Sequence, residues 1–167
     1  MTTMTKTKVA TQVYRVFIKA TPQAIWDAIT SPEWTQKYGY GGRAEYDLRP
    51  GGAYRALAPA AMLAMGAPEV VVDGEVVEAD PPRKLVQTWR PLWDPELIAE
   101  GHKRLTWEVA DSGDGITALT VTHELEDAPK TAAQVAGTTE GAAGGGGWSW
   151  VLSDLKTLLE TGKPLAG

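Results

Sequence analysis

The hydrophobic and polar positions along the chain predict several short strands followed by one long helix. Between residues 147 and 162, apolar side chains recur at a spacing that places them on one helical stripe, at positions 148, 151, 152, 155, 158 and 159. Gly162 and Pro164 end this pattern. Because nearly everything before this helix is strand-like, its stripe is expected to lie on an antiparallel sheet and to enclose a cavity with it.

Seven segments combine β-branched and aromatic residues with turn signals at their ends, which is typical of strands. They cover residues 12–20, 44–48, 53–57, 70–79, 84–90, 102–110 and 116–125. Two short helices are expected after the first strand, because Thr21-Pro22 and Ser31-Pro32 each combine a capping residue with a proline at the first helical position. Consecutive strands can pair as hairpins. The sequence therefore predicts an α+β fold, in which a curved antiparallel sheet of about six to seven strands wraps around the C-terminal helix.

The last two strands indicate a register. Residues 105, 107 and 109 share one apolar face, and residues 119, 121, 123 and 125 share another. Matching these faces across a turn at residues 111–115 pairs 109 with 117, 107 with 119 and 105 with 121. The same register turns His123 toward the buried face and His102 outward, near Glu124.

Two loops carry unusual apolar content. Residues 59–68 include Met62 and Met65, and residues 91–101 include Trp93 and can hold a helical turn after Asp94. Such side chains are consistent with a lid over a pocket, a dimer patch or simple loop anchors. Residues 128–147 can open as a helix, but their glycines predict a flexible approach to the last helix. A single domain is expected over residues 12–163, after a flexible segment at residues 1–11.

Composition and charge narrow the class of protein. A chain of 167 residues with 43% hydrophobic residues and a net charge of −5 fits one globular domain and offers no basic surface for nucleic acid. The absence of cysteine excludes thiol catalysis and disulfides, and it fits a cytoplasmic location. No apolar run is long enough to span a bilayer, and residues 1–11 lack a signal core. Seven Trp against one Phe is more than a core needs, so some indoles are expected to line a pocket.

The expected pocket is aromatic and has few titratable groups. Its ligand-binding candidates are Trp34, Tyr38, Tyr46, Tyr54, Met62, Met65, Gln87, Trp89, Trp107, His123, Trp148 and Leu152. His123 is the candidate for a catalytic acid or base, or for a hydrogen bond to a ligand. The alternative for His123 is a core histidine whose hydrogen bonds are satisfied within the protein.

Other chemistry has little support in the sequence. The two histidines are expected on opposite faces of the sheet, and no paired-carboxylate motif accompanies them, so no metal site is expected. None of the four serines lies in a Gly-x-Ser-x-Gly motif. The glycine-rich run at residues 141–147 lacks the Gly-Lys-Ser/Thr ending of a phosphate loop. No cofactor is therefore expected.

Four segments, in order, resemble one known superfamily. They are VFIKATPQAIWDAIT with the following SPEW (residues 16–34), GGAYR (residues 51–55), the strand–turn–strand over residues 74–89, and the closing helix from Gly147-Trp148. Together they resemble the START-like helix-grip (SRPBCC) superfamily, and most closely its bacterial branch similar to the C-terminal domain of the Hsp90 ATPase activator (AHSA1-like). The resemblance covers most of the chain. It implies an incomplete antiparallel barrel wrapped on a long helix, with a deep cavity for apolar molecules.

The resemblance leaves several functions open, because the superfamily includes lipid carriers, hormone receptors, polyketide cyclases and aromatases, and sequestering resistance proteins. Binding or sequestration of a small hydrophobic or aromatic ligand is favoured by the aromatic content and the apolar loops. One alternative is a cyclase- or aromatase-like enzyme that uses acid and base groups of the pocket. The other is a chaperone-associated module like the Hsp90 activator. A homodimer is favoured over a monomer, because exposed apolar loops need cover.

Overall fold

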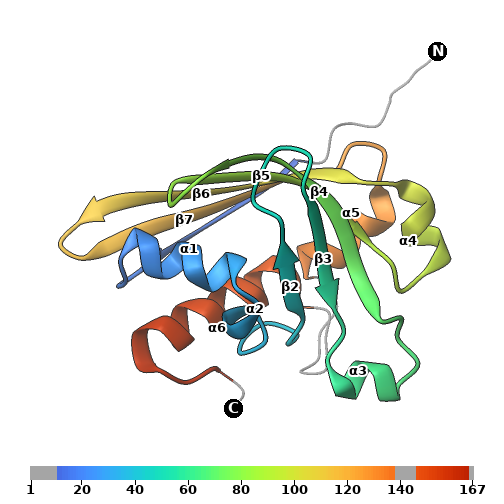
Figure 1. Ribbon diagram of the computed structural model, residues 1–167, viewed down its shortest axis with the longest axis horizontal. Coiled ribbons are helices and arrows are strands. Elements are labelled where there is room, and N and C mark those ends of the chain that lie inside the picture. The colour runs from blue at the N-terminus through green and yellow to red at the C-terminus, as the bar shows by residue number, and fades with distance from the viewer. Residues whose placement is uncertain (1–10, 138–145, 166–167) are drawn as a thin grey trace.

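The fold is described by a computed structural model of residues 11–137 and 146–165 (Figure 1). Its elements are β1 (Thr11–Ile18), α1 (Pro22–Thr30), α2 (Pro32–Thr35), β2 (Arg43–Tyr46), β3 (Ala53–Leu57), α3 (Ala60–Ala64), β4 (Val70–Asp80), β5 (Lys84–Pro91), α4 (Pro95–Glu100), β6 (Lys103–Gly113), β7 (Ile116–Glu124), α5 (Pro129–Ala136) and α6 (Gly147–Thr161). All predicted strands are present, as are the two helices after β1. The N-terminal segment expected to be flexible falls almost wholly outside the described residues, as does most of the glycine run before α6.

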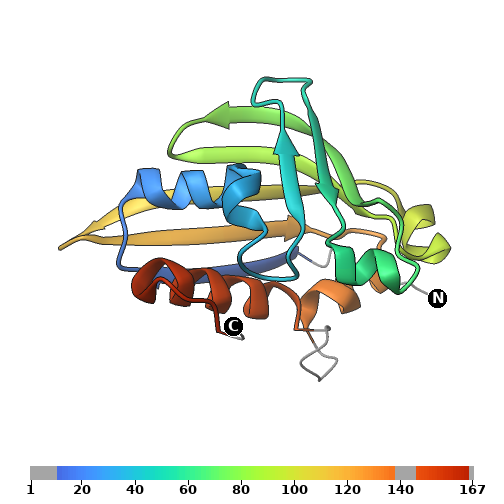
Figure 2. The ribbon, with the colours of Figure 1, turned by 60° about the horizontal axis from the view of Figure 1, so that its bottom comes forward.

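The strands form one seven-stranded sheet in the order β1-β7-β6-β5-β4-β3-β2. Every neighbouring pair of strands is antiparallel. The sheet curves, and α6 runs along its concave side together with α1 (Figure 2). This arrangement confirms the predicted α+β helix-grip fold. It also means that side chains on the inner faces of the strands and on α6 point into a shared interior.

Helices α1 and α2 begin at the predicted sites but differ in their caps. The Thr21 side chain accepts a hydrogen bond from the Ala24 backbone N–H at 3.1 Å, and Pro22 occupies the first turn of α1. Ser31 also stands at the N-cap position of α2, but its side chain makes no capping hydrogen bond. The expectation that Ser31 caps a helix through its side chain is therefore wrong, because Pro32 alone supplies the start signal.

Helix α6 carries the predicted apolar stripe. Its buried members are Trp148, Leu152, Leu155 and Leu158, and its half-buried flanks are Val151 and Leu159. Gly162 ends the helix in the left-handed region, where its N–H donates to the Leu158 carbonyl at 2.8 Å. Each fully buried leucine contributes roughly 1.5–3 kcal/mol, so this stripe is a major source of the attachment of α6 to the sheet.

One buried residue of α6 does not belong to the stripe. Asp154 is only 3% exposed, although a charged residue of an amphipathic helix is expected to face solvent. Its carboxylate accepts hydrogen bonds from the Gly39 N–H at 2.8 Å and from the Leu165 N–H at 2.7 Å. Asp154 thus joins α6 to the loop before β2 and to the segment after the helix. These two charge-assisted bonds compensate for its burial.

The register of β6 and β7 differs from the predicted one by two residues. Trp107 pairs with Val121, and Leu105 pairs with His123. The difference arises because the turn is shorter than expected: Gly113 pairs with Ile116 across a hairpin whose two central residues both have positive φ. Because the shift is even, every side chain keeps its predicted face, and His123 is fully buried as expected.

The expected position of His102 near Glu124 is wrong. In the shifted register Arg104, not His102, stands opposite Glu124. His102 instead lies just before β6, and its Nε2 is 2.9 Å from Asp73 Oδ1 on β4. Arg90 of β5 also pairs with Asp73, at 3.0 Å. His102 thus lies in a partly exposed cluster with side chains of β4 and β5, whereas its predicted neighbour belongs to β7, on the other flank of β6.

Both apolar loops contain short helices. Helix α3 occupies the middle of the first loop, and α4 follows Asp94, whose side chain accepts a hydrogen bond from the Glu96 N–H at 2.8 Å. The expected helical turn after Asp94 is confirmed, as is the helix at the start of the segment that leads to α6. In the described part of the chain, no helix is long and apolar enough to cross a membrane.

Candidate ligand-binding cavity

A cavity of about 470 Å³ lies between the concave side of the sheet and helices α3, α5 and α6. This volume is within the range of small-molecule sites. Its lining comprises Ile29, Thr35, Tyr38, Gly39, Tyr40, Gly42, Ala44, Tyr46, Tyr54, Ala56, Met62, Met65, Ala67, Val71, Val72, Trp89, Trp93, Trp107, Gln134, Val135, Gly147, Trp148 and Val151. None of these described residues is Asp, Glu, Lys, Arg or His, so the cavity is uncharged throughout its described lining.

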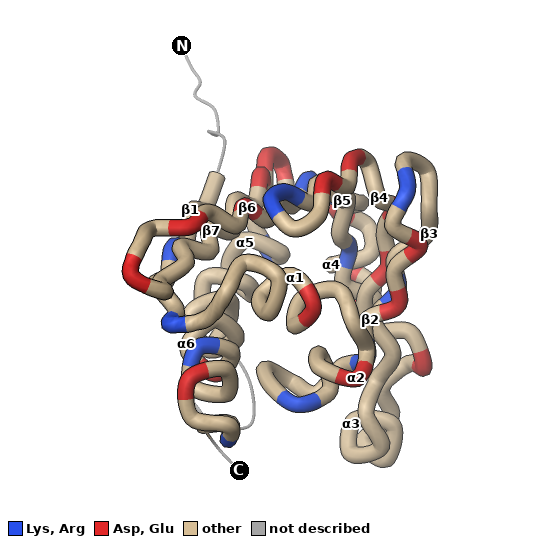
Figure 3. The backbone as a smooth tube through the Cα atoms, turned by 60° about the vertical axis from the view of Figure 1, so that its left-hand side comes forward, with Lys and Arg blue, Asp and Glu red and all other residues tan. Residues whose placement is uncertain are grey.

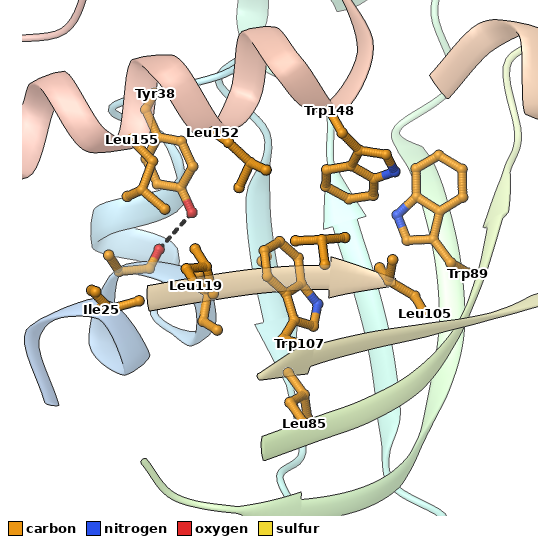
Figure 4. Close-up of a cluster of buried hydrophobic side chains, with 14 of the residues drawn as sticks. Ile25, Tyr38, Leu85, Trp89, Leu105, Trp107, Leu119, Trp148, Leu152 and Leu155 are labelled. Carbon is orange, nitrogen blue, oxygen red and sulfur yellow. Dashed lines mark hydrogen bonds between the residues drawn. The ribbon is translucent and has the colours of Figure 1, made fainter. Parts of the chain in front are cut away.

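Three indoles form one wall of the cavity. Trp148 projects from α6 toward the sheet, where it meets Trp107 of β6 and Trp89 of β5 (Figure 4). The ring centroids of Trp107 and Trp148 are 5.5 Å apart in a T-shaped arrangement. Those of Trp89 and Trp148 are 6.0 Å apart. Such contacts fix the rings relative to one another.

Two tyrosines form a further part of the lining. Tyr46 of β2 and Tyr54 of β3 are direct partners in the hairpin, and their rings stack with centroids 4.6 Å apart. The Tyr46 hydroxyl donates a hydrogen bond to Gln87 Oε1 at 2.6 Å. Trp107 Nε1 donates to the same oxygen at 3.0 Å. Gln87 is fully buried, so it acts behind the wall as a shared acceptor.

His123 has a similar position behind Trp148. Its Nδ1 accepts a hydrogen bond from Trp148 Nε1 at 3.1 Å. Desolvation by burial lowers the pKa of His123 from its ordinary 6.5 to about 3, so the ring is neutral at physiological pH. With Nδ1 as the acceptor, the proton of the neutral ring is on Nε2. Within the described residues, this Nε2 is the buried side-chain atom that has no hydrogen-bond partner.

The phenols of the cavity are also held in their neutral form. Burial raises the pKa of Tyr38, Tyr46 and Tyr54 well above the ordinary value for tyrosine. The Tyr38 hydroxyl donates to the Ala28 carbonyl at 2.8 Å, which joins the lining to α1. Neither a phenolate nor an imidazolium is therefore available in the cavity near neutral pH.

The structure brings together eight of the twelve residues predicted to form the site. The eight that line the cavity are Tyr38, Tyr46, Tyr54, Met62, Met65, Trp89, Trp107 and Trp148. Met65 is at the rim, where it is 87% exposed. Gln87, His123 and Leu152 are buried behind or beside the lining rather than in it.

Trp34 is the predicted site residue that lies apart from the cavity. It contributes to a separate depression with Leu158 and Leu159 of α6. The Lys37 ammonium is 4.5 Å from the centroid of the Trp34 ring, which is a cation–π contact. The expectation that Trp34 faces the same space as the other indoles is not met.

Several lining residues were not predicted from the sequence. Ala44 and Ala56, on β2 and β3, are small inward-facing residues that leave room where larger side chains would fill the space. Tyr40 and Trp93 belong to the rim. Among the described residues, no group of three or more potential ligand side chains is arranged to hold a metal ion.

A curved antiparallel sheet closed by a C-terminal helix over an apolar cavity defines a helix-grip protein. The chain belongs to the family described as activator of Hsp90 ATPase homolog 1-like protein, whose profile matches residues 19–160. The predicted resemblance is thus confirmed. No curated relative matches the chain.

Solved structures with low sequence identity share the fold. CalU16 from Micromonospora echinospora is 18% identical, with a TM-score of 0.63 over 92% of this chain and 78% of its own. The Aha1 dimer from Colwellia psychrerythraea is 16% identical, with a TM-score of 0.65 over 92% of this chain and 98% of its own. PFC0360w, an HSP90 activator from Plasmodium falciparum, is 20% identical, with a TM-score of 0.54 over 93% of this chain and 91% of its own.

Proposed function

We propose that the protein binds or sequesters a small, uncharged, hydrophobic or aromatic molecule in the cavity beneath α6. The observation that carries this proposal is the cavity itself: about 470 Å³ of space with an aromatic wall and no charged side chain among its described lining residues. Removal of a flat apolar molecule from water into such a space is favourable, at about 25 cal/mol per Å² of buried apolar area. A charged molecule would lose its hydration without gaining a partner there.

The protonation states of His123 and of the buried tyrosines favour ligand binding over acid–base catalysis. A general base needs a pKa near the working pH, whereas burial holds the pKa of His123 at about 3. Its Nδ1 is already occupied by Trp148. The buried phenols have raised pKa values, which makes them weak acids as well. These groups are suited to hydrogen bonding in fixed neutral forms.

Native mass spectrometry of the purified protein tests the proposal directly. We expect a neutral apolar molecule to co-purify, or fluorene added as a probe to bind with one-to-one stoichiometry. Ala56→Trp, which fills the cavity, should abolish binding. Ala110→Trp on the exposed face of β6 is the matched control and should retain it. Binding that survives Ala56→Trp in a folded protein, or no binding by the wild-type protein, would refute the cavity as the site.

A second candidate function is association with Hsp90. It is favoured by the family to which the chain belongs and by exposed apolar residues, namely Leu63 and Met65 at α3 and Trp93 between β5 and α4. Helix α3 carries no charged residue (Figure 3). We expect this candidate to show as stimulation of Hsp90 ATPase activity that Met65→Asp reduces. No stimulation at saturating protein would dismiss it, independently of ligand binding.

A further inference from the structure

A short segment before β2, residues 38–42, contributes backbone as well as side chains to the cavity, and we call it the strap. Its residues that line the cavity are Tyr38, Gly39, Tyr40 and Gly42. A hydrogen bond from the Gly41 N–H to the Tyr38 carbonyl, at 3.1 Å, closes it as a turn. Three of its five residues are glycine, so few side chains anchor it. The position of the strap therefore depends on its hydrogen bonds to neighbouring elements.

Three hydrogen bonds join the strap to α6 and to the residue just before it. Gly39 is held on both sides: its N–H donates to Asp154 Oδ2 at 2.8 Å, and its carbonyl accepts from Trp150 Nε1 at 3.3 Å. At the other end, the Tyr40 hydroxyl accepts from the Gly146 N–H at 2.9 Å. Helix α6 thus places the strap, and with it one part of the cavity lining.

Asp154 is the unusual member of these attachments. It is 3% exposed and does not line the cavity, and among the described residues no Lys or Arg side chain forms an ion pair with it. A buried carboxylate is costly unless hydrogen bonds compensate for its lost hydration. Both of its partners, the N–H groups of Gly39 and Leu165, are donors, so both oxygens must accept. The packing of α6 needs no carboxylate here, which leaves the two groups that Asp154 holds as the reason for its presence.

We propose that Asp154 is a positioning residue of the ligand cavity: by holding Gly39, it fixes the strap in its ligand-binding position and so raises the affinity of the site. The inference rests on the proposed function and adds to it a residue that does not touch the ligand. A strap that is fixed before the ligand arrives does not have to be ordered on binding, which lowers the entropic cost of association. The second oxygen of Asp154 serves a different end, because Leu165 follows α6 and is not part of the lining.

Equilibrium dialysis with fluorene, at a temperature at which each variant is folded, tests this role. Asp154→Ala removes the carboxylate, whereas Trp150→Phe removes only the hydrogen bond to the Gly39 carbonyl and leaves Asp154 in place. We expect both variants to bind fluorene roughly three- to tenfold more weakly than the wild-type protein, the usual effect of one lost hydrogen bond. Amide hydrogen exchange in residues 38–42 should be faster in both variants, and fluorene should slow it in the wild-type protein.

A chain shortened to end at Pro164 is the control. It lacks the Leu165 N–H but keeps the hydrogen bond from Gly39 to Asp154, so it should be less stable and still bind fluorene with wild-type affinity. If Asp154→Ala does not fold, Trp150→Phe decides alone. Wild-type affinity in either substituted variant, or an equal loss of affinity in the shortened chain, would overturn the inference while the cavity remained a binding site. Failure of the wild-type protein to bind fluorene would overturn the proposed function and this inference with it.

Discussion

Acidification should destabilise the protein through one buried residue, His123. In the folded state its pKa is about 3, and in the unfolded chain it returns to about 6.5. As the pH falls below 6.5, the unfolded chain takes up a proton that the folded protein does not. The stabilising contribution of the neutral ring is therefore complete above pH 6.5, declines through the acid range, and is lost near pH 3.

The size of the effect follows from the pKa difference. Each unit corresponds to about 1.4 kcal/mol, so the full loss between pH 6.5 and 3 is on the order of 5 kcal/mol. Between pH 7 and 5 the same relation gives a loss of about 2 kcal/mol. Asp73, Glu100 and Glu160 have pKa values below their ordinary ones and titrate in a more acidic range. The loss of stability between pH 7 and 5 therefore reports the protonation of histidine.

Urea unfolding at pH 7, 6 and 5 measures this difference. The variant His123→Gln keeps a side-chain oxygen that can accept from Trp148 but cannot titrate. We expect the wild-type protein to lose about 2 kcal/mol more than His123→Gln over this interval. The variant His102→Gln, at the exposed histidine, should retain the loss assigned to His123. Equal pH dependence in the wild-type protein and His123→Gln would refute the view that His123 is buried as a neutral ring.

Three further substitutions can be tested by the same unfolding assay at neutral pH. Gln87→Leu should lower the free energy of unfolding by about 2–5 kcal/mol, because it leaves two buried donors without an acceptor. Adding Tyr46→Phe should recover part of this loss. A double variant whose losses are fully additive would contradict the shared acceptor. Asp154→Ala should lower the free energy of unfolding by about 2–5 kcal/mol, because two hydrogen bonds from backbone N–H groups to the carboxylate are lost. An unchanged free energy of unfolding would show that these hydrogen bonds are dispensable. Gly74→Ala should lower the free energy of unfolding by about 1–3 kcal/mol, since a Cβ would lie 1.9 Å from the Thr88 backbone oxygen. If the variant were as stable as the wild-type protein, β4 and β5 would be free to move apart at this position.

Local signals in the sequence were sufficient for α1 and α6 and for the inward faces of the strands, but not for α3, which lies in a segment predicted to be a loop. The periodic stripe of α6 and the Thr21-Pro22 start of α1 depend only on neighbouring residues, and both are confirmed. The face of His123 was also predictable, because a strand alternates with a period of two. Its pairing partner was not, because that depends on a two-residue turn whose backbone geometry the residue types alone did not reveal.

Features that depend on distant contacts could not be predicted in the same way. Asp154 reads as a solvent-facing residue of an amphipathic helix, and only the approach of Gly39 and Leu165 makes its burial favourable. Trp34 lies in a four-residue helix that is too short for periodicity to orient it. The space left by Ala44 and Ala56 is a property of the assembled sheet, because a cavity is defined by the side chains that surround it.

Hydrogen bonds behind the aromatic wall help to keep the cavity open. A lining around empty space lacks dispersion contacts on one side, so side chains that are free to turn inward would fill it. Trp107 and Trp148 are prevented from doing so by hydrogen bonds to Gln87 and His123. The one phenylalanine, Phe17, has no such polar group and lies on the outer face of β1, where it is 53% exposed. A wall of phenylalanine would have similar apolar area but no restraint on its rings, so the volume of the cavity depends on the buried polar residues behind the wall.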